Sequence, residues 1–312
     1  MKSAFFEKNG ATPIVPIQYT NREGFSTQFW LKRDDLIDPN VSGNKWRKLK
    51  FNIKHAITHN YQGVASFGGA FSNHIAALAF AAHKAGLNSV GFIRCDHIDP
   101  NNPTLALAKT LGMKLHPLTR GEYRQRHQTD FIASLQAQYP NFCIIPEGGS
   151  NELALDGLQE LAAEINQQGD FDVVASAVGS GGTIAGLSKH CQQQTLGVAV
   201  VKDNALHERL SSEFPSKLQL HDGAMFGGYA KFNLELEQFC VDFFEQTQVV
   251  IEPIYTGKLM YALCHQRAQL GFDDNTRILA IHTGGLQGLK GLAYRRQIAL
   301  PLWSRAIQSL AL

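Results

Sequence analysis

The chain has 312 residues, of which 44% are hydrophobic and 18% are charged, so it is expected to fold rather than to be disordered. Its 29 basic and 27 acidic residues give a formal net charge of +2, which offers no overall attraction for nucleic acid or an anionic membrane. Five cysteines lie far apart without C-x-x-C spacing, which argues against a disulfide framework or zinc knuckle and predicts a reducing cytoplasm. The first residues lack the apolar core of a signal peptide, and no apolar run is long enough to span a bilayer.

The predicted elements begin with a helix near Lys45 and continue as short apolar runs that alternate with helical stretches. This alternation predicts parallel sheets in an α/β fold. A strand followed by a glycine turn and a helix occurs at 64–86 and again at 173–191, which predicts two lobes with a ligand at the carboxyl ends of their strands. The predicted strands lie in 63–69, 89–95, 113–119, 143–149, 172–182, 195–201 and 277–285; the predicted helices lie in 72–86, 104–112, 124–140, 151–169, 183–192 and, as a pair, in 238–271.

The glycine turn in "AVGSGGTIAG" suits a phosphate, because it exposes backbone N–H groups at the beginning of a helix. Known nucleotide and hydrolase fingerprints do not fit it. Ile184 stands where a dinucleotide-binding turn needs its third glycine, no Gly-Lys-Ser/Thr follows, and Val178 replaces the first glycine of a serine-hydrolase elbow. An ordinary tight turn between strand and helix is the alternative.

A second turn, "SFGGAFSNH", has the same character. Gly68 and Gly69 permit close backbone approach, and Ser72 and Asn73 open the following helix with side chains that donate and accept hydrogen bonds. A capped helix with no ligand is the alternative. Two such turns together indicate a ligand pair with two anionic ends, such as a phosphate and a carboxylate.

Lys45, in "SGNKWRKL", lies at the beginning of a helix and beside its apolar face. Lys50 flanks the opposite edge of that face, so helical geometry does not choose between them, but the helix dipole and partial burial disfavour a charged amine at Lys45. A lysine of lowered pKa is a Schiff-base nucleophile, whereas an exposed lysine is the alternative. An imine-forming lysine with phosphate and carboxylate sites describes pyridoxal phosphate acting on an amino acid. Three further basic residues of this helix are expected to be solvated: Arg47, Lys48 and Lys54.

The motifs "SGNKWRKL", "GGAFSNH", "GSGGTIAGL", "EPIYTGK" and "HTGG" resemble, in order, those of the 1-aminocyclopropane-1-carboxylate (ACC) deaminase and D-cysteine desulfhydrase family. The resemblance implies fold type II: two open twisted, mostly parallel sheets flanked by helices, with pyridoxal phosphate in the cleft between a larger domain (1–48 plus 149–312) and a smaller one (49–148). It also implies a homodimer that takes a small amino acid as substrate.

By the same resemblance, Lys45 would bind the cofactor covalently and Asn73 would contact its ring hydroxyl. Ser72 and neighbouring amides would take the substrate carboxylate, and Tyr229 and Tyr255 match active-site tyrosines. The phosphate cradle would consist of Gly179, Ser180, Gly181, Gly182 and Thr183.

Two departures favour the desulfhydrase branch, since Thr256 and Thr283 stand where ACC deaminases have glutamate and leucine. A threonine hydroxyl forms only a neutral hydrogen bond with the pyridine nitrogen, which suits elimination of a good leaving group such as thiolate. The expected reaction is conversion of D-cysteine to pyruvate, sulfide and ammonia, with Lys45 as general acid and base. The alternatives are ACC deamination to 2-oxobutanoate, racemisation with Ser72 opposite Lys45, and a non-catalytic phosphate-binding protein.

His55 and His59 have the i, i+4 spacing of a metal clasp. Ala56 follows His55 in place of the glutamate of a metalloprotease helix, and no third ligand is apparent. We therefore expect no metal. His282, before the last glycine turn, is expected to be a packed strand residue.

Overall fold

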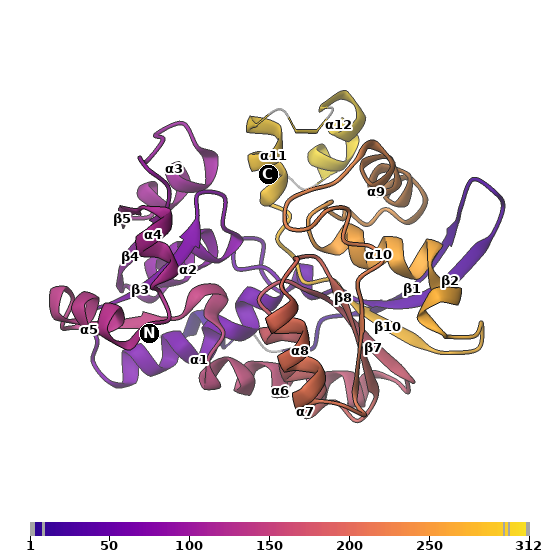
Figure 1. Cartoon of the computed structure of the whole chain (residues 1–312), viewed down its shortest axis with the longest axis horizontal. Helices are drawn as coiled ribbons and strands as arrows, with labels where there is room; N and C mark the ends of the chain where they lie inside the picture. The colour runs from indigo at the N-terminus through magenta and orange to yellow at the C-terminus, as the bar shows by residue number, and fades with distance from the viewer. Residues whose placement is uncertain (1–3, 8–9, 296, 299, 310–312) are drawn as a thin grey trace.

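The strands form two separate sheets in the computed structural model, which describes residues 4–7, 10–295, 297–298 and 300–309 (Figure 1). The large sheet has the order β1-β2-β10-β7-β8-β9 and the small sheet the order β5-β4-β3-β6. Every neighbouring pair is parallel except β1 and β2, so the expected pair of mostly parallel sheets flanked by helices is confirmed. The strands are β1 Ile14–Thr20, β2 Ser26–Lys32, β3 Gly63–Gly69, β4 Asn88–Arg94, β5 Met113–Leu118, β6 Phe142–Ile145, β7 Val173–Val178, β8 Gln194–Ala199, β9 Leu218–His221 and β10 Ile278–Ile281.

The helices agree with the expected alternation, with one shortened element and several additions. Within the expected helix at 124–140 only 129–138 is helical, as α5, because α4 lies before it and shares only residue 124 with that range. The pattern did not predict the β1–β2 hairpin, α4, α8, β9, α11 or α12. Pro16 explains part of this, because a proline inside an apolar run weakens a strand prediction, and β1 indeed lies at a sheet edge. The helices are α1 Asn44–Thr58, α2 Asn73–Ala85, α3 Pro103–Thr110, α4 Arg120–Arg124, α5 Thr129–Gln138, α6 Glu152–Gln168, α7 Gly182–His190, α8 Asn204–Glu213, α9 Leu234–Thr247, α10 Thr256–His265, α11 Gly288–Tyr294 and α12 Leu300–Ser309.

The apolar face of α1 packs with the small sheet. Trp46 and Leu49 of α1 belong to one buried cluster that also contains Phe6, Val41 and residues of α2 and β3. A boundary between residues 48 and 49 would therefore divide one packed face of a helix. We propose that the smaller domain begins before α1, at about residue 41, and that the segments 14–32 and 173–281 build the larger sheet.

Helix α6 packs against α1 and also against α7, and the three helices lie along the lower edge of Figure 1. A Cβ on Gly157 of α6 would lie 1.9 Å from the carbonyl oxygen of Arg47, and a Cβ on Gly186 of α7 would lie 2.3 Å from Leu158 Cδ1. Both glycines thus permit a helix approach that any side chain would prevent. As a result, α6 sets the position of α1 relative to α7.

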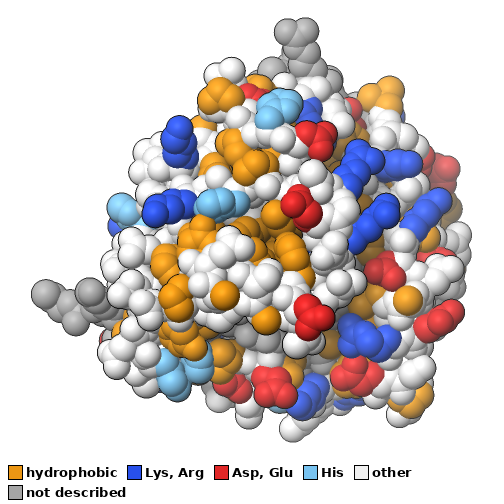
Figure 2. Space-filling model, turned by 60° about the vertical axis from the view of Figure 1, so that its left-hand side comes forward, with side chains coloured by type: hydrophobic (Ala, Val, Ile, Leu, Met, Phe, Trp, Pro, Cys, Tyr) orange, Lys and Arg blue, Asp and Glu red, His pale blue; other side chains and the backbone are white. Residues whose placement is uncertain are grey.

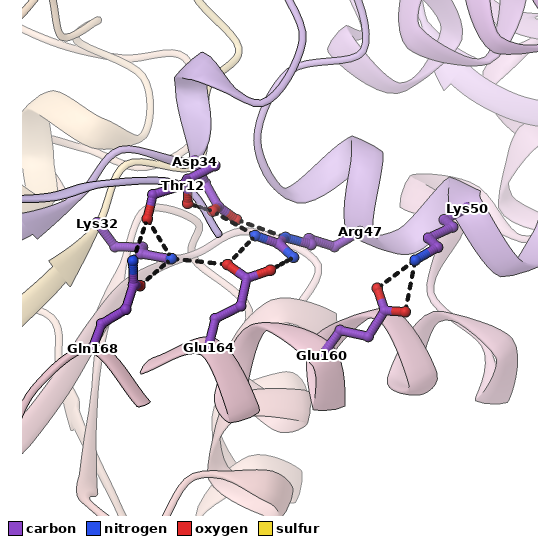
Figure 3. A network of polar contacts seen from close by, with 8 residues as sticks. All are labelled: Thr12, Lys32, Asp34, Arg47, Lys50, Glu160, Glu164 and Gln168. Atoms are coloured by element: carbon purple, nitrogen blue, oxygen red, sulfur yellow. Dashed lines mark hydrogen bonds and ion pairs between the residues drawn. The ribbon is translucent and has the colours of Figure 1, made fainter. Parts of the chain in front are cut away.

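A buried polar network joins α1 and α6 to β2 (Figure 3). Arg47 of α1 donates to Asp34 at 2.9 and 3.1 Å and to Glu164 of α6 at 2.5 and 2.9 Å. Lys32, at the end of β2, donates to Glu164 at 2.8 Å and to the Thr12 carbonyl at 2.7 Å. The expectation that Arg47 is solvated is therefore wrong, because Glu164 approaches from more than 100 residues away and makes burial of the guanidinium possible.

Charges of both signs are interspersed over the face drawn in Figure 2, apart from one group of basic side chains toward its right edge. This distribution agrees with the small formal net charge of +2. Among the described residues, no helix has the length and apolar character needed to cross a membrane.

The α1–α6 contact gives a stability prediction. Gly157→Ala places a methyl group 1.9 Å from the Arg47 carbonyl, so we expect a loss of about 1–3 kcal/mol in the free energy of unfolding, measured by urea denaturation. Gly121→Ala is the matched control, because its Cβ would meet nothing closer than 3.9 Å within α4, and alanine there is expected to be neutral or slightly stabilising. Equal midpoints for the two variants would contradict the assigned contact.

Candidate cofactor and substrate site

Lys45 directs its amine into the protein interior, close to the glycine turn at the beginning of α7. Lys45 Nζ donates to Asn44 Oδ1 at 3.1 Å, and Asn44 Nδ2 donates to Thr183 Oγ1 at 3.1 Å. Burial lowers the pKa of Lys45 to about 8. Part of the side chain borders a cavity of about 340 Å³ that Asn73 and Gly285 also line. The amine expected to react is therefore desolvated, although the side chain as a whole is only partly buried, and it is linked through a single residue to the turn expected to hold phosphate.

The segment after β10 is pressed against the turn that precedes Lys45. Gly43 has φ +59°, and a Cβ there would lie 2.1 Å from the carbonyl oxygen of Thr283. The Asn44 N–H donates to the same oxygen at 3.2 Å. His282 packs behind this segment, with Nε2 bonded to the Val250 carbonyl at 2.7 Å and Nδ1 accepting from Gly284, which is the structural position expected for it. The close approach brings Thr283 to the beginning of α1.

Lys48 lies one helical turn after Lys45 and contributes a second buried amine. Its side chain is only 1% exposed, so the expectation that it is solvated is wrong. Lys48 Nζ donates to Ser150 Oγ at 3.0 Å and would lie 2.8 Å from a Cβ on Gly182, the first residue of α7. Burial, together with the charge of Lys45, holds the pKa of Lys48 well below its usual range. The i, i+3 spacing from Lys45 is the sequence signal that would have suggested this position.

His74 lies between the two amines and the small sheet. Its Nε2 is hydrogen-bonded to Ser66 Oγ of β3 at 2.8 Å, while its buried Nδ1 has no partner within the described part of the chain. Burial and the charges of Lys45 and Lys48 hold the pKa of His74 well below its usual range, so the imidazole is neutral. Sequence reasoning did not single out His74, because a histidine on an apolar helix face carries no signal by itself.

Ser72 and Asn73 open α2 from the end of β3, as the sequence predicted. Ser72 Oγ caps the helix by accepting from the Ile75 N–H at 3.3 Å. Asn73 Oδ1 accepts from Gln287 at 3.1 Å, and Asn73 Nδ2 would lie 2.6 Å from a Cβ on Gly285. The second glycine turn therefore meets the segment after β10 on the same side as Lys45.

The two tyrosines from the resemblance lie together against the glycine turn of α7. Their rings are arranged edge to face with centroids 6.1 Å apart, and Tyr255 Cε1 would lie 3.0 Å from a Cβ on Gly179. Tyr229 remains 47% exposed. Burial, together with Tyr229, Glu252 and Glu147, holds the pKa of Tyr255 well above its usual range, so its phenol keeps its proton.

The charged residues of "EPIYTGK" hold this tyrosine pair in position. Glu252 is buried and accepts from backbone N–H groups at the beginning of α10 at 2.7–2.9 Å; burial raises its pKa to about 7 despite these bonds. Thr256 Oγ1 donates to the Glu252 carboxylate at 3.2 Å and accepts from the backbone N–H of Glu252 at 3.1 Å. Lys258 Nζ donates to the carbonyls of Met225 and Gly228 at 2.7 Å, which fixes the loop that carries Tyr229.

Together these residues fit a phosphate-bearing aldehyde. The beginning of a helix, with its backbone N–H groups, and a neighbouring lysine both favour an anion. A Cβ on Gly182 would lie 2.8 Å from Lys48 Nζ and 2.4 Å from Ser150 Oγ, so the glycine leaves the space between them open. A buried amine of pKa about 8 suits an aldehyde. Pyridoxal phosphate combines both groups.

Comparisons with known proteins agree with this chemistry. A 30% identical relative from Arabidopsis thaliana, described as a mitochondrial bifunctional D-cysteine desulfhydrase and ACC deaminase, matches over 93% of this chain and 81% of its own length. The D-cysteine desulfhydrase of Serratia proteamaculans is also 30% identical, over 92% of this chain and 94% of that protein. A crystal structure described as an ACC deaminase homologue superposes with a TM-score of 0.78 at 27% identity and covers 92% of this chain and 93% of its own.

The sequence profile described as "Pyridoxal-phosphate dependent enzyme" matches residues 6–284, which include every residue of the candidate site except Gly285 and Gln287. The chain therefore belongs to the family of pyridoxal-phosphate dependent enzymes.

Proposed function

We propose that this enzyme is a lyase or deaminase of small amino acids that converts D-cysteine and water to pyruvate, sulfide and ammonia. The observation that carries the proposal is the partly buried Lys45, whose amine is linked through Asn44 to the glycine turn of α7. The names of the Arabidopsis and Serratia relatives, which both include D-cysteine desulfhydrase, support the choice of substrate.

We assign the cofactor to residues on both sides of the cleft. Lys45 would hold it covalently, and Asn73 would contact its ring hydroxyl. Lys48 would provide a cation for the phosphate. The glycine turn would cradle the phosphate with Gly179, Ser180, Gly181, Gly182 and Thr183. Pyridoxal phosphate, when bound, withdraws electrons from the substrate Cα and so permits loss of a proton there and of a substituent on the next carbon.

The protein would then position the substrate and move protons. Ser72 and neighbouring amides would bind the α-carboxylate, and Lys45 would remove the Cα proton, since an amine of pKa about 8 is partly neutral near physiological pH. Tyr255 keeps its proton and lies beside Tyr229 at the opening, so either phenol would donate to the departing sulfur.

Of the two threonines assigned to the pyridine nitrogen, we favour Thr283. The proton of the Thr256 hydroxyl is engaged by Glu252, whereas Thr283 Oγ1 has no partner among the residues that the structure describes. A neutral hydroxyl at this nitrogen makes a weaker electron sink than a carboxylate, which suits loss of thiolate better than opening of a cyclopropane ring.

ACC deamination to 2-oxobutanoate and ammonia is the second candidate. The Arabidopsis relative carries both activities in its name, and a 28% identical relative from Pyrococcus horikoshii is described as a putative ACC deaminase. The same Lys45 and Ser72 would serve this reaction.

We further propose a homodimer in a reducing compartment such as the cytoplasm. Support for the dimer comes from the family resemblance. Support for the compartment comes from the five cysteines, all of which are free thiols in the structure.

A substrate panel tests the reaction. Purified enzyme loaded with pyridoxal phosphate should release pyruvate and sulfide from D-cysteine with a kcat/KM at least about tenfold above that for ACC, because thiolate is the better leaving group. The L-amino acids serve as the stereochemical control. Rapid turnover of ACC with inert D-cysteine would overturn the assignment.

Borohydride trapping tests the reactive amine. After incubation with pyridoxal phosphate and reduction, mass spectrometry should find the adduct on Lys45, with none at that site in Lys45→Ala. Trapping should reach half its maximum near pH 8, because only the neutral amine adds to the aldehyde and its pKa is about 8. Lys48→Met should keep the adduct on Lys45 but require about tenfold more cofactor. An adduct mainly on Lys48 in the unmodified enzyme would refute the assignment.

Isosteric valine substitutions separate the two threonines. Thr283→Val should lower kcat about tenfold or more with little change in unfolding midpoint, because it removes a hydroxyl assigned to the cofactor. Thr256→Val should instead lower the free energy of unfolding by about 1–3 kcal/mol, since it leaves buried Glu252 with one donor fewer. A loss of kcat in Thr256→Val together with a loss of stability in Thr283→Val would instead assign the contact with the pyridine nitrogen to Thr256.

A further inference from the structure

Two arginines flank residues 69–72, the loop assigned to the substrate carboxylate. The guanidinium carbon of Arg295, at the end of α11, lies 4.4 Å from the ring centroid of Phe71 in that loop. Phe71 in turn packs against α11, where a Cβ on Gly291 would lie 2.7 Å from its Cδ1. Arg295 is thus held against the loop from the side of the larger sheet.

Arg295 has no carboxylate partner among the described residues, although it is partly buried. Its Nε makes one long hydrogen bond, 3.4 Å, to the Gly291 carbonyl. Burial lowers the pKa of Arg295, and the nearby phenol of Tyr229 acts in the opposite direction. By contrast, buried Arg47 pairs with both Asp34 and Glu164. The guanidinium of Arg295 therefore keeps several donors for a ligand next to Phe71.

Arg94 approaches the same loop from the other side. It is the last residue of β4, lies opposite Gly69 in the sheet register, and would place Nη2 3.8 Å from a Cβ on Gly69. Its guanidinium carbon lies 5.5 Å from the ring centroid of Tyr123. Arg126, which also stacks on Tyr123, is paired with Glu147 at 2.5 Å, whereas Arg94 has no ion pair within the described residues.

We propose that Arg295, assisted by Arg94, selects amino acids whose side chain carries an acidic group in addition to the α-carboxylate. The inference rests on the proposed function, because residues 69–72 are assigned to the α-carboxylate and the two cations lie next to that loop, Arg295 at Phe71 and the exposed Arg94 at Gly69. Guanidinium groups bind carboxylates and other planar or tetrahedral oxyanions through paired N–H donors. The same field favours the thiolate form of a cysteine substrate.

Aspartate and asparagine provide a direct test, since they have nearly the same shape and differ in charge. Isothermal titration calorimetry of each D and L form with the enzyme loaded with pyridoxal phosphate should show at least about tenfold tighter binding of aspartate for one enantiomer. Arg295→Gln should remove most of that preference while asparagine binding changes less than about twofold. Arg22→Gln is the control, because Arg22 pairs with Asp242 on the exposed β1–β2 hairpin and should leave the ratio unchanged.

Two results would overturn the inference: equal affinity of the unmodified enzyme for aspartate and asparagine, or an equal loss for both ligands in Arg295→Gln, which would assign Arg295 to the α-carboxylate. If Arg295→Gln does not fold, the inference is tested instead with Arg94→Gln and with the ratio of aspartate to asparagine affinity in the unmodified enzyme.

Calorimetry measures binding and does not require turnover. Absence of sulfide release with a retained aspartate preference would therefore refute the proposed reaction and keep the inference.

Discussion

The placement of Arg47 between Asp34 and Glu164 is the constraint on which the site depends. A buried guanidinium is stable only when carboxylates compensate it, so removing either partner would leave an unpaired charge in the interior. Because Arg47 belongs to α1 and Glu164 to α6, the pair fixes the helix that carries Lys45 and Lys48. The backbone contact at Gly157 fixes the same helices sterically. Polar and steric constraints therefore agree on one position for the two amines.

Most ionisable groups near the site serve the geometry rather than the reaction. Glu252 orders the beginning of α10, Lys258 holds the loop of Tyr229, and His282 ties β10 to Val250. Each is buried, and each has hydrogen bonds that account for its burial. Lys45 and Lys48 differ, because their burial is less compensated and lowers the pKa of both amines. That difference separates the two amines that we propose to react or to bind an anion from the groups that support them.

The loop assigned to the substrate carboxylate meets segments that are distant in the chain. Phe71 follows β3 and Arg295 follows α11, yet the Arg295 guanidinium stacks on the Phe71 ring, and the Tyr229 phenol, from the loop before α9, acts electrostatically on Arg295. A second link across the same region is the 2.8 Å hydrogen bond from Tyr294 to Asp99. Substrate selection thus depends on how the two sheets meet.

The sequence by itself determined the alternation of strands and helices, the two glycine turns and the family, and it predicts Lys45 as the reactive amine, because these depend on local spacing and residue type. Only the tertiary structure decided that Arg47 and Lys48 are buried, that the Thr256 hydroxyl is taken by Glu252, and that Arg295 faces Phe71. Helical spacing tells which residues share a face, but what covers that face comes from elsewhere in the chain, as α6 does for α1. The segments that pack over a face therefore decide which side chains are buried. Burial in turn decides the pKa of each side chain and the donors that it keeps for a ligand.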